Sequence, residues 1–274
     1  EEMFLVGENR YKAVQDKFSK IPGSPVAYWV SKSIQALFQN DNLNNHFDIK
    51  AGICTGDNSQ YILYWQEVDF TKTYMNTPTD YLYSAHNKGG EYRKWYGNRD
   101  VVLKYNADSL KAMEKNEGFR HDGKEYYFRE HIGWSKVSSG RLSFRYYESG
   151  FTFDSAGLGL FPHSQKSIFV TLAFLNSKIC ESLIALLNPT LNVTPMVVKK
   201  LPYTMSNASD VIEHLVQINI GLSKAEWDSF ETSWDFQQHP LVRCKTVAEA
   251  YRIWEGECNE RFNTLKANEK EPNR

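Results

Sequence analysis

Apolar positions between residues 24 and 38 recur at the spacing of one helix face. The stretch reads SPVAYWVSKSIQALF, and its first residue, Ser24, is of a type that caps helix N-termini. Pro25 suits the first helical turn, where a backbone N–H is not needed for an intrahelical bond. The apolar stripe continues to Phe38. This pattern predicts a helix over residues 24–38.

A second helical pattern covers residues 168–187. Asn176 and Ser177 interrupt its apolar run and Pro189 follows its end, so the pattern predicts two helices joined by a tight corner. The next apolar run, VVKKLPY, favours a short strand or turn. Residues 47–105 and 125–161 have a different texture, in which short β-type runs alternate with Gly, Asn and Pro turns.

Two capping-box sequences lie near the C-terminus, SKAE at residues 223–226 and TVAE at residues 246–249. The second precedes an apolar stripe at helical spacing that runs to Leu265. We expect an amphipathic helix of about five turns there, packed on a surface inside or outside this chain.

These patterns predict an α+β fold. Its expected parts are an N-terminal linker and helix (residues 1–45), a mixed β-rich recognition-type domain with packed helices (46–203) and a helical C-terminal segment (204–274). The 274 residues are 41% hydrophobic and 24% charged, as in an ordinary soluble protein. The high aromatic share of 14% suits either a site for flat ligands or a tyrosine-rich core.

Cysteine and histidine usage argues against a metal site. The four cysteines form no CxxC pair and the seven histidines form no HExxH motif, so we expect no zinc and a reducing cytoplasm. No apolar run reaches 18 residues and no signal peptide opens the chain, so we expect no membrane association. Both ends resemble cuts through a longer polypeptide.

The net charge of −1 hides a strong separation of charge along the chain. Residues 86–104 and 129–145 each carry an excess of three positive charges, whereas residues 206–239 carry six acids against one lysine. This asymmetry favours a protein that grips a polyanion on one side only.

Three segments carry the candidate chemistry. In AGICTGDNSQYI, Thr55 and Asn58 belong either to a tight turn or to a glycine turn that brings polar groups against a phosphate or base edge. In NKGGEYRKWYGN, Lys88, Arg93 and Lys94 stand among glycines that allow close backbone approach to DNA. There we expect Trp95 to pack beneath the loop.

The third segment is EHIGWSKVSSGRLSFRYY. Its candidate DNA contacts are polar or cationic side chains: Lys136, Ser138, Ser139, Arg141 and Arg145. Arg141 and Arg145 alternate with Ser143, which predicts one shared strand face. That face is either a solvated surface or, together with the loop above, a concave cationic surface for nucleic acid, where arginine reads guanine and lysine grips phosphate.

A search for catalytic motifs is negative. DSAGLGLF, from Asp154, has the glycines of a cofactor loop, but Pro162 follows where a helix would be needed. NPTL, from Asn188, contains only half of the Asn-Pro-Pro-Tyr motif that clamps adenine for N6 methylation. No nucleophile stands beside a base, so we expect no catalytic residues in this chain.

A family resemblance rests on eight stretches that follow one another in a fixed order along the chain. They are IPGSPVAYWVS, AGICTGDNSQ, NKGGEYRKWYGN, IGWSKVSSGRLSFRY, GFTFDSAG, FLNSK, LNPTLN and WDSFETSWDFQQHPL. Over nearly the whole chain it resembles the C-terminal target-recognition half of the PglX family, the adenine-specific DNA methyltransferases of BREX phage-defence systems. It is more distantly similar to specificity domains of TaqI-like and type IIG restriction–modification enzymes.

The resemblance implies a sequence-specific recognition domain for double-stranded DNA, whose parent enzyme uses S-adenosylmethionine to mark self DNA in the bacterial cytoplasm. It also implies that residues 1–45 join a catalytic half lying upstream, so this segment alone would hold no cofactor and methylate nothing. Implied partners are DNA, that catalytic half, other BREX components and a phage DNA-mimic inhibitor.

Two alternatives stay open. One is a self-sufficient methyltransferase with an unusual cofactor loop at Asp154, and the other is a protein-interaction module within a phage-defence complex.

Overall fold

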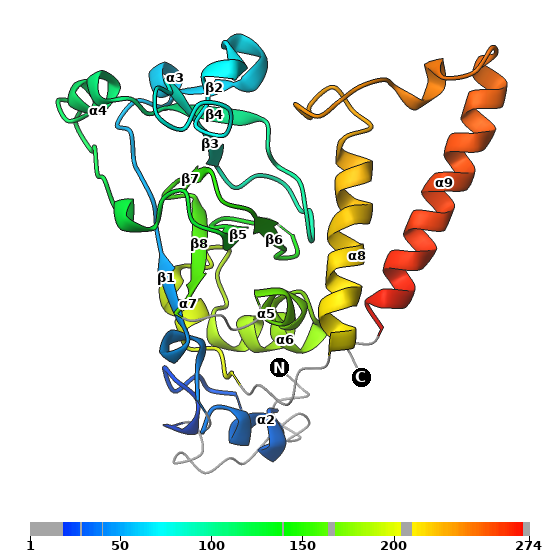
Figure 1. Cartoon of the computed structure of the whole chain (residues 1–274). Helices are drawn as coiled ribbons and strands as arrows, with labels where there is room; N and C mark the ends of the chain where they lie inside the picture. The colour runs from blue at the N-terminus through cyan, green and yellow to red at the C-terminus, as the bar shows by residue number, and fades with distance from the viewer. Residues whose placement is uncertain are drawn as a thin grey trace, which may run out of the picture.

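Two four-stranded sheets lie at the centre of the computed structural model, which describes residues 19–27, 29–39, 41–138, 140–163, 168–203 and 210–270 (Figure 1). The first sheet is antiparallel and contains, in order, β1 (Phe47–Lys50), β8 (Gly157–Pro162), β5 (His131–Ser135) and β6 (Phe144–Tyr147). The second contains, in order, β2 (Ile62–Tyr64), β4 (Val101–Lys104), β3 (Tyr83–Asn87) and β7 (Phe151–Phe153), with β3 and β7 parallel. The short segment between β7 and β8 links the two sheets.

Helices cover the first sheet and also form a pair beside it (Figure 1). α5 (Ile168–Leu175) and α6 (Lys178–Leu187) pack near the first sheet, and α8 (Asp210–Trp227) packs against α5. α9 (Val247–Asn268) stands next to α8, and the Asn268 side chain donates a 2.9 Å hydrogen bond to that of Asn219. The shorter helices are α2 (Lys32–Leu37), α3 (Asn58–Tyr61), α4 (Ala107–Met113) and α7 (Pro195–Lys199).

Two large buried clusters, with a small third one around Phe151, hold the described residues of this frame together. The larger joins the first sheet to its helices and includes Trp134 of β5, Leu172 of α5 and Val216 of α8. The second lies among strands of both sheets and includes Leu103 and Phe153. Each fully buried side chain of this size contributes roughly 1.5–3 kcal/mol through removal from water. Among the described residues no single helix is long and apolar enough to span a membrane. α5 and α6 together have the length and composition of a span, but the chain bends by 67° between them.

The α+β class is confirmed, and so are two expected helix starts. Ser177 forms the corner between α5 and α6 and caps α6 by accepting a 3.2 Å hydrogen bond from the Cys180 N–H. Thr246 caps α9 in the same way, from the Glu249 N–H at 3.2 Å. The domain boundaries at residues 45 and 203 stay predictions.

Three expectations about elements are wrong. The N-terminal helix begins at Lys32, because Ser31 is its cap and Ser24 has a positive φ of 48° that no extended N-cap adopts. Part of the VVKKLPY run is helical, since Pro195 starts α7 and buries Val198 in the core. The SKAE sequence starts no helix because it lies in the last turns of α8.

Candidate nucleic-acid interface

The loop NKGGEYRKWYGN begins directly on the first sheet. A Cβ on Gly157 of β8 would lie 2.2 Å from the Asn87 carbonyl oxygen and 2.5 Å from the Gly89 nitrogen. Only glycine therefore allows the loop to cross β8 at this distance. Gly157 therefore allows the backbone of the loop to pack directly on the backbone of β8.

The same loop then runs beside β6. The Trp95 N–H donates to the Phe144 carbonyl at 3.0 Å, and the Tyr146 N–H donates to the Trp95 carbonyl at 2.9 Å. Trp95 is buried, as expected, with a φ of 72°. A bulky residue in the left-handed region is strained, and such strain persists only where surrounding contacts fix it. The two basic segments of the sequence thus do converge.

Arg145 does not face the surface that we expected. Its side chain is fully buried, and its guanidinium donates to the Arg93 carbonyl, the Ser143 and Ser135 hydroxyls and the Tyr147 hydroxyl at 3.2–3.4 Å. Arg145 therefore supports the loop from below and is not available to contact DNA in this conformation.

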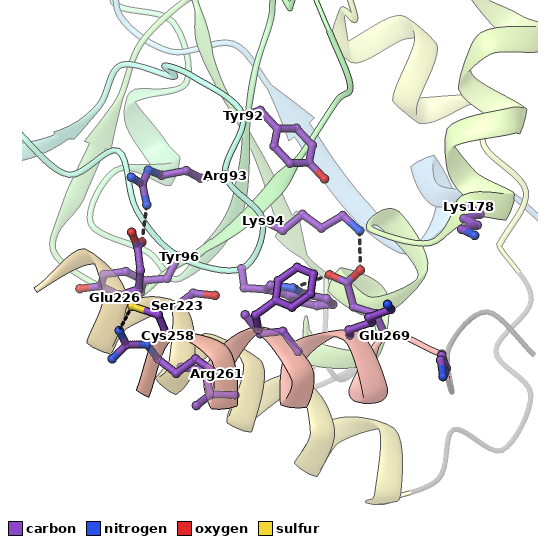
Figure 2. A pocket seen from close by; sticks show the side chains of 16 residues that line it. Tyr92, Arg93, Lys94, Tyr96, Lys178, Ser223, Glu226, Cys258, Arg261 and Glu269 are labelled. Carbon is purple, nitrogen blue, oxygen red and sulfur yellow. Dashed lines mark hydrogen bonds and ion pairs between the residues drawn. The ribbon is translucent and has the colours of Figure 1, made fainter. Parts of the chain in front are cut away.

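Arg93 and Lys94 point away from the sheet toward α8 and α9 (Figure 2). Arg93 Nη1 lies 2.6 Å from a carboxylate oxygen of Glu226, and its guanidinium lies over the Trp227 ring at 5.0 Å. Lys94 Nζ lies 3.1 Å from Oε2 of Glu269. The last turn of α8 and the C-terminal end of α9 thereby meet the loop.

A groove of about 960 Å³ lies between this loop and the two helices (Figure 2). Its lining includes two glutamates, Glu226 and Glu269, and four aromatic residues, Tyr92, Trp95, Tyr96 and Phe262. The lining also contains six cationic residues: Arg93, Lys94, Lys178, Arg261, Lys266 and Lys270. Of the four rings, Tyr92 and Phe262 are exposed, and positive charge beside exposed aromatic rings suits a ligand with phosphates and flat bases.

A smaller cavity of about 300 Å³ continues from the groove and shares Tyr92, Lys94 and Glu269 with it. Ser138 and Arg141 line this second cavity. The Arg141 side chain is 73% exposed and lies 3.4 Å from a Glu181 carboxylate oxygen. The Ser138 hydroxyl donates to the Arg141 carbonyl at 3.0 Å, which shapes the turn that carries the arginine.

The other candidate contacts line neither cavity. Thr55 is fully buried and donates to the Asn58 side chain at 2.8 Å, so the tight-turn interpretation fits this pair. Lys136 is half-buried, and its backbone N–H donates to the Ala156 carbonyl. Lys88 forms an ion pair with Asp154 at 2.7 Å. Ser139 lies outside the described residues.

The Asp154 stretch differs from a cofactor loop. Asp154 is buried, and the glycines that follow, Gly157 and Gly159, lie within β8 instead of leading directly into a helix. Burial alone would raise the pKa of Asp154, but the His86 imidazole, with Nε2 3.5 Å from Oδ2, and the ammonium of Lys88 lower it to about 2. The carboxylate thus ties β3 to the link between the sheets. In the described part of the chain, no three His, Cys, Asp or Glu side chains gather into a possible metal site.

Sequence reasoning missed four of the groove's cations. Lys178 begins α6, and Arg261, Lys266 and Lys270 follow one another along α9 and just beyond it. Arg261 and Leu265 are four residues apart, as are Lys266 and Lys270, and this spacing was the available signal, because residues three or four apart on a helix share a side.

Comparisons with known proteins agree with the sequence resemblance. No protein-family model matches the chain. It is 38% identical, over an alignment of 285 residues, to the adenine-specific methyltransferase PglX of Lacticaseibacillus casei (strain Zhang), covering 96% of this chain and 24% of that protein. It is 33% identical over 249 residues to the adenine-specific methyltransferase BrxX of Escherichia coli O9:H4 (strain HS), covering 90% of this chain and 20% of that protein.

Among solved structures, the chain is similar to the type IIL restriction–modification enzyme MmeI in complex with DNA. The TM-score is 0.39 at 10% identity, covering 85% of this chain and 36% of that one, which is too weak a likeness to support a conclusion. The matched share of the methyltransferases is smaller than the half that the resemblance suggested. The chain is homologous to the adenine-specific methyltransferases PglX and BrxX, and it spans about a quarter and a fifth of their respective lengths.

Proposed function

We propose that this chain is the part of an S-adenosylmethionine-dependent N6-adenine DNA methyltransferase that recognises a short site in double-stranded DNA during bacteriophage defence. The cofactor and the chemistry belong to the catalytic part of the same protein. That part, other BREX components and a phage DNA-mimic inhibitor are the further partners that this proposal includes.

The groove between the loop and α9 is the observation that carries the proposal. Six Lys or Arg side chains and four aromatic rings line it, against two carboxylates. Lysines beside such a groove bind backbone phosphates without regard to sequence. Arg141, exposed in the adjoining cavity, has the planar donor fork that can read a guanine edge.

Salt dependence tests the proposal. Binding of a fluorescent duplex, measured by anisotropy, should weaken about 100-fold between about 50 and 200 mM salt if about four phosphates are contacted. Affinity that does not change over this range would contradict a phosphate-binding groove.

Two variants separate phosphate contact from base recognition. Lys266→Ala should weaken binding to all sequences alike and reduce the salt slope by about one. Arg141→Ala should reduce discrimination between sequences by about 1–3 kcal/mol. Lys115→Ala, at an exposed lysine that lines neither cavity, changes the net charge equally and should leave both properties intact. If all three variants behave alike, the assignment of these roles is wrong.

A second candidate function is a protein-interaction module. Val247, Tyr251 and Phe262 of α9 are each at least half exposed, and apolar residues on one helix are a common feature of docking surfaces. Tight binding to another component of the defence complex, together with the absence of DNA binding at low salt, would favour this function over the first.

A further inference from the structure

The two cations that the loop presents to the groove are already paired with the chain's own carboxylates. Arg93 meets Glu226 at 2.6 Å and Lys94 meets Glu269 at 3.1 Å. Both acids belong to the C-terminal helices, 133 and 175 residues further along the chain. A phosphate that bound either cation would have to displace a glutamate.

Glu269 is held in the way that a phosphodiester would be held. One of its oxygens, Oε2, accepts from Lys94 Nζ, and the other, Oε1, accepts from the Trp95 indole N–H at 3.0 Å. Two adjacent residues of the loop therefore bracket one anionic group through its two oxygens. A backbone phosphate also offers two non-bridging oxygens that share a negative charge.

The helix positions of these acids point to the same role. Glu226 is the penultimate residue of α8, and Glu269 is the C-cap of α9. A negative charge at a helix C-terminus is unfavourable because the macrodipole is negative there. At these positions the two carboxylates destabilise their own helices, but they form ion pairs with the cations of the loop.

The ion pairs are also accessible to competitors. The four paired side chains are 21–42% exposed, so solvent screens them and a mobile polyanion can reach them. Exchange of a carboxylate for a phosphate at such a pair requires no change in the buried core.

We infer that Glu226 and Glu269 are internal counter-charges that occupy the phosphate positions of the groove until DNA arrives. This inference rests on the proposed function. DNA binding exchanges the two carboxylates for phosphates and releases the C-terminal ends of α8 and α9 from the loop. The helix pair therefore regulates access to the groove that it lines.

The double variant Glu226→Gln/Glu269→Gln tests the inference, because the amides keep the shape and remove the charge. Its matched control is Glu231→Gln/Glu260→Gln, which removes two exposed carboxylates of the same C-terminal segment that line neither cavity. Exposed ion pairs of this kind correspond to an affinity gain of about 3- to 30-fold for the first variant. The control should stay within about 2-fold of the wild type at moderate salt, where distant charges are screened.

Hydrogen exchange supplies a second measurement. Addition of duplex DNA to the wild-type chain should speed amide exchange in the last two turns of α9, since those turns lose their contact with the loop. In the double glutamine variant the exchange should be fast before DNA is added.

The outcomes are distinguishable. If wild type, variant and control all fail to bind DNA at low salt, the proposed function is wrong, and the inference falls with it. If the wild type binds DNA but variant and control gain equally, or α9 becomes more protected, the inference alone is overturned. Should the double variant fail to melt cooperatively, the single variants replace it, each with about half of the logarithmic gain.

Discussion

His131 illustrates how single buried residues couple this fold to pH. Its ring stacks on Tyr147 with centroids 5.0 Å apart, and its Nδ1–H donates to the Arg129 carbonyl at 2.9 Å. Nε2 is buried and has no partner among the described residues. Burial, with the nearby Arg99 charge as a smaller cause, lowers the pKa of His131 to about 4. The folded protein therefore holds this histidine neutral at pH values where the unfolded chain protonates it.

His131→Phe should flatten the acid side of the stability profile. Because the folded pKa lies below the unfolded value of 6.5, the contribution is complete above pH 6.5 and is lost as the pH falls toward about 4. The loss amounts to at most about 3 kcal/mol. Urea unfolding between about pH 7.5 and 4.5 measures it. His86, whose pKa burial also lowers, keeps its share of the slope in the variant.

His214→Phe is the matched control, because His214 is exposed on α8. It should leave the slope as in the wild type. An unchanged slope in His131→Phe would show that the buried imidazole does not resist protonation.

The prediction that the loop cations and Arg141 contact DNA stays a prediction, whereas the same prediction for Arg145 conflicts with its burial. Alternation placed Arg141 and Arg145 on one face, yet only Arg145 lies within β6. Its guanidinium is buried because it donates to oxygen atoms of Arg93 and Ser135, which lie 52 and 10 positions away in the sequence. A local pattern has no access to such acceptors, because they come from segments that only the tertiary fold brings close.

At the scale of elements, prediction succeeded where the signal is local. Ser177 and Thr246 are side-chain caps, and both begin the helices that the sequence indicated. It failed for α7, because the β-branched residues Val197 and Val198 favour a strand while burial of Val198 in the core selects a helix. The groove could not be predicted from the sequence for a similar reason, since its walls come from segments that only the tertiary fold brings together.

Gly97 lies where the loop packs closely against α8. It has a φ of 125°, and a Cβ there would lie 2.7 Å from Cδ of Arg93 and 3.3 Å from the Trp227 ring. Gly97→Ala should therefore destabilise the fold by about 1–3 kcal/mol and displace Arg93 from Glu226. Thermal unfolding measures the first effect, and DNA affinity at fixed salt reports the second.

Gly221→Ala is the opposite control, because Gly221 lies in α8 with open space around its Cβ position. That change should stabilise the chain by up to about 1 kcal/mol through helix propensity. If Gly97→Ala were equally stabilising, the loop would not be constrained by α8.

At the scale of the whole molecule, the C-terminal segment is attached by the packing of α8 on α5 and also at two places outside that core contact. One is the meeting of α8 and α9 with the loop, through Glu226 and Glu269. The other follows α8, where the Trp65 indole N–H donates to the Thr232 carbonyl at 3.0 Å and Trp234 packs against aromatic rings. The contacts with the loop can therefore open while the core packing of α8 and the contacts of Trp65 and Trp234 hold the helix pair in place.

Trp234→Ala should detach the second attachment and expose the segment to protease. Trp234 stacks on Phe70 with centroids 5.2 Å apart and contacts Phe151 of β7 at 5.9 Å, so its removal takes away most of this contact. A loss of about 1.4 kcal/mol in local stability raises the open population about tenfold, and limited proteolysis followed by mass spectrometry measures cleavage within residues 228–246. The sheets should remain folded, because the ring belongs to neither of the two larger buried clusters and packs only against a small third one, formed by Ala85, Tyr147 and Phe151. Trp29→Ala, at an exposed tryptophan in the N-terminal part, should leave cleavage of the segment unchanged. Equal cleavage rates in Trp234→Ala and the wild type would mean that the packing of α8 on α5 and the loop contacts hold the segment without this ring.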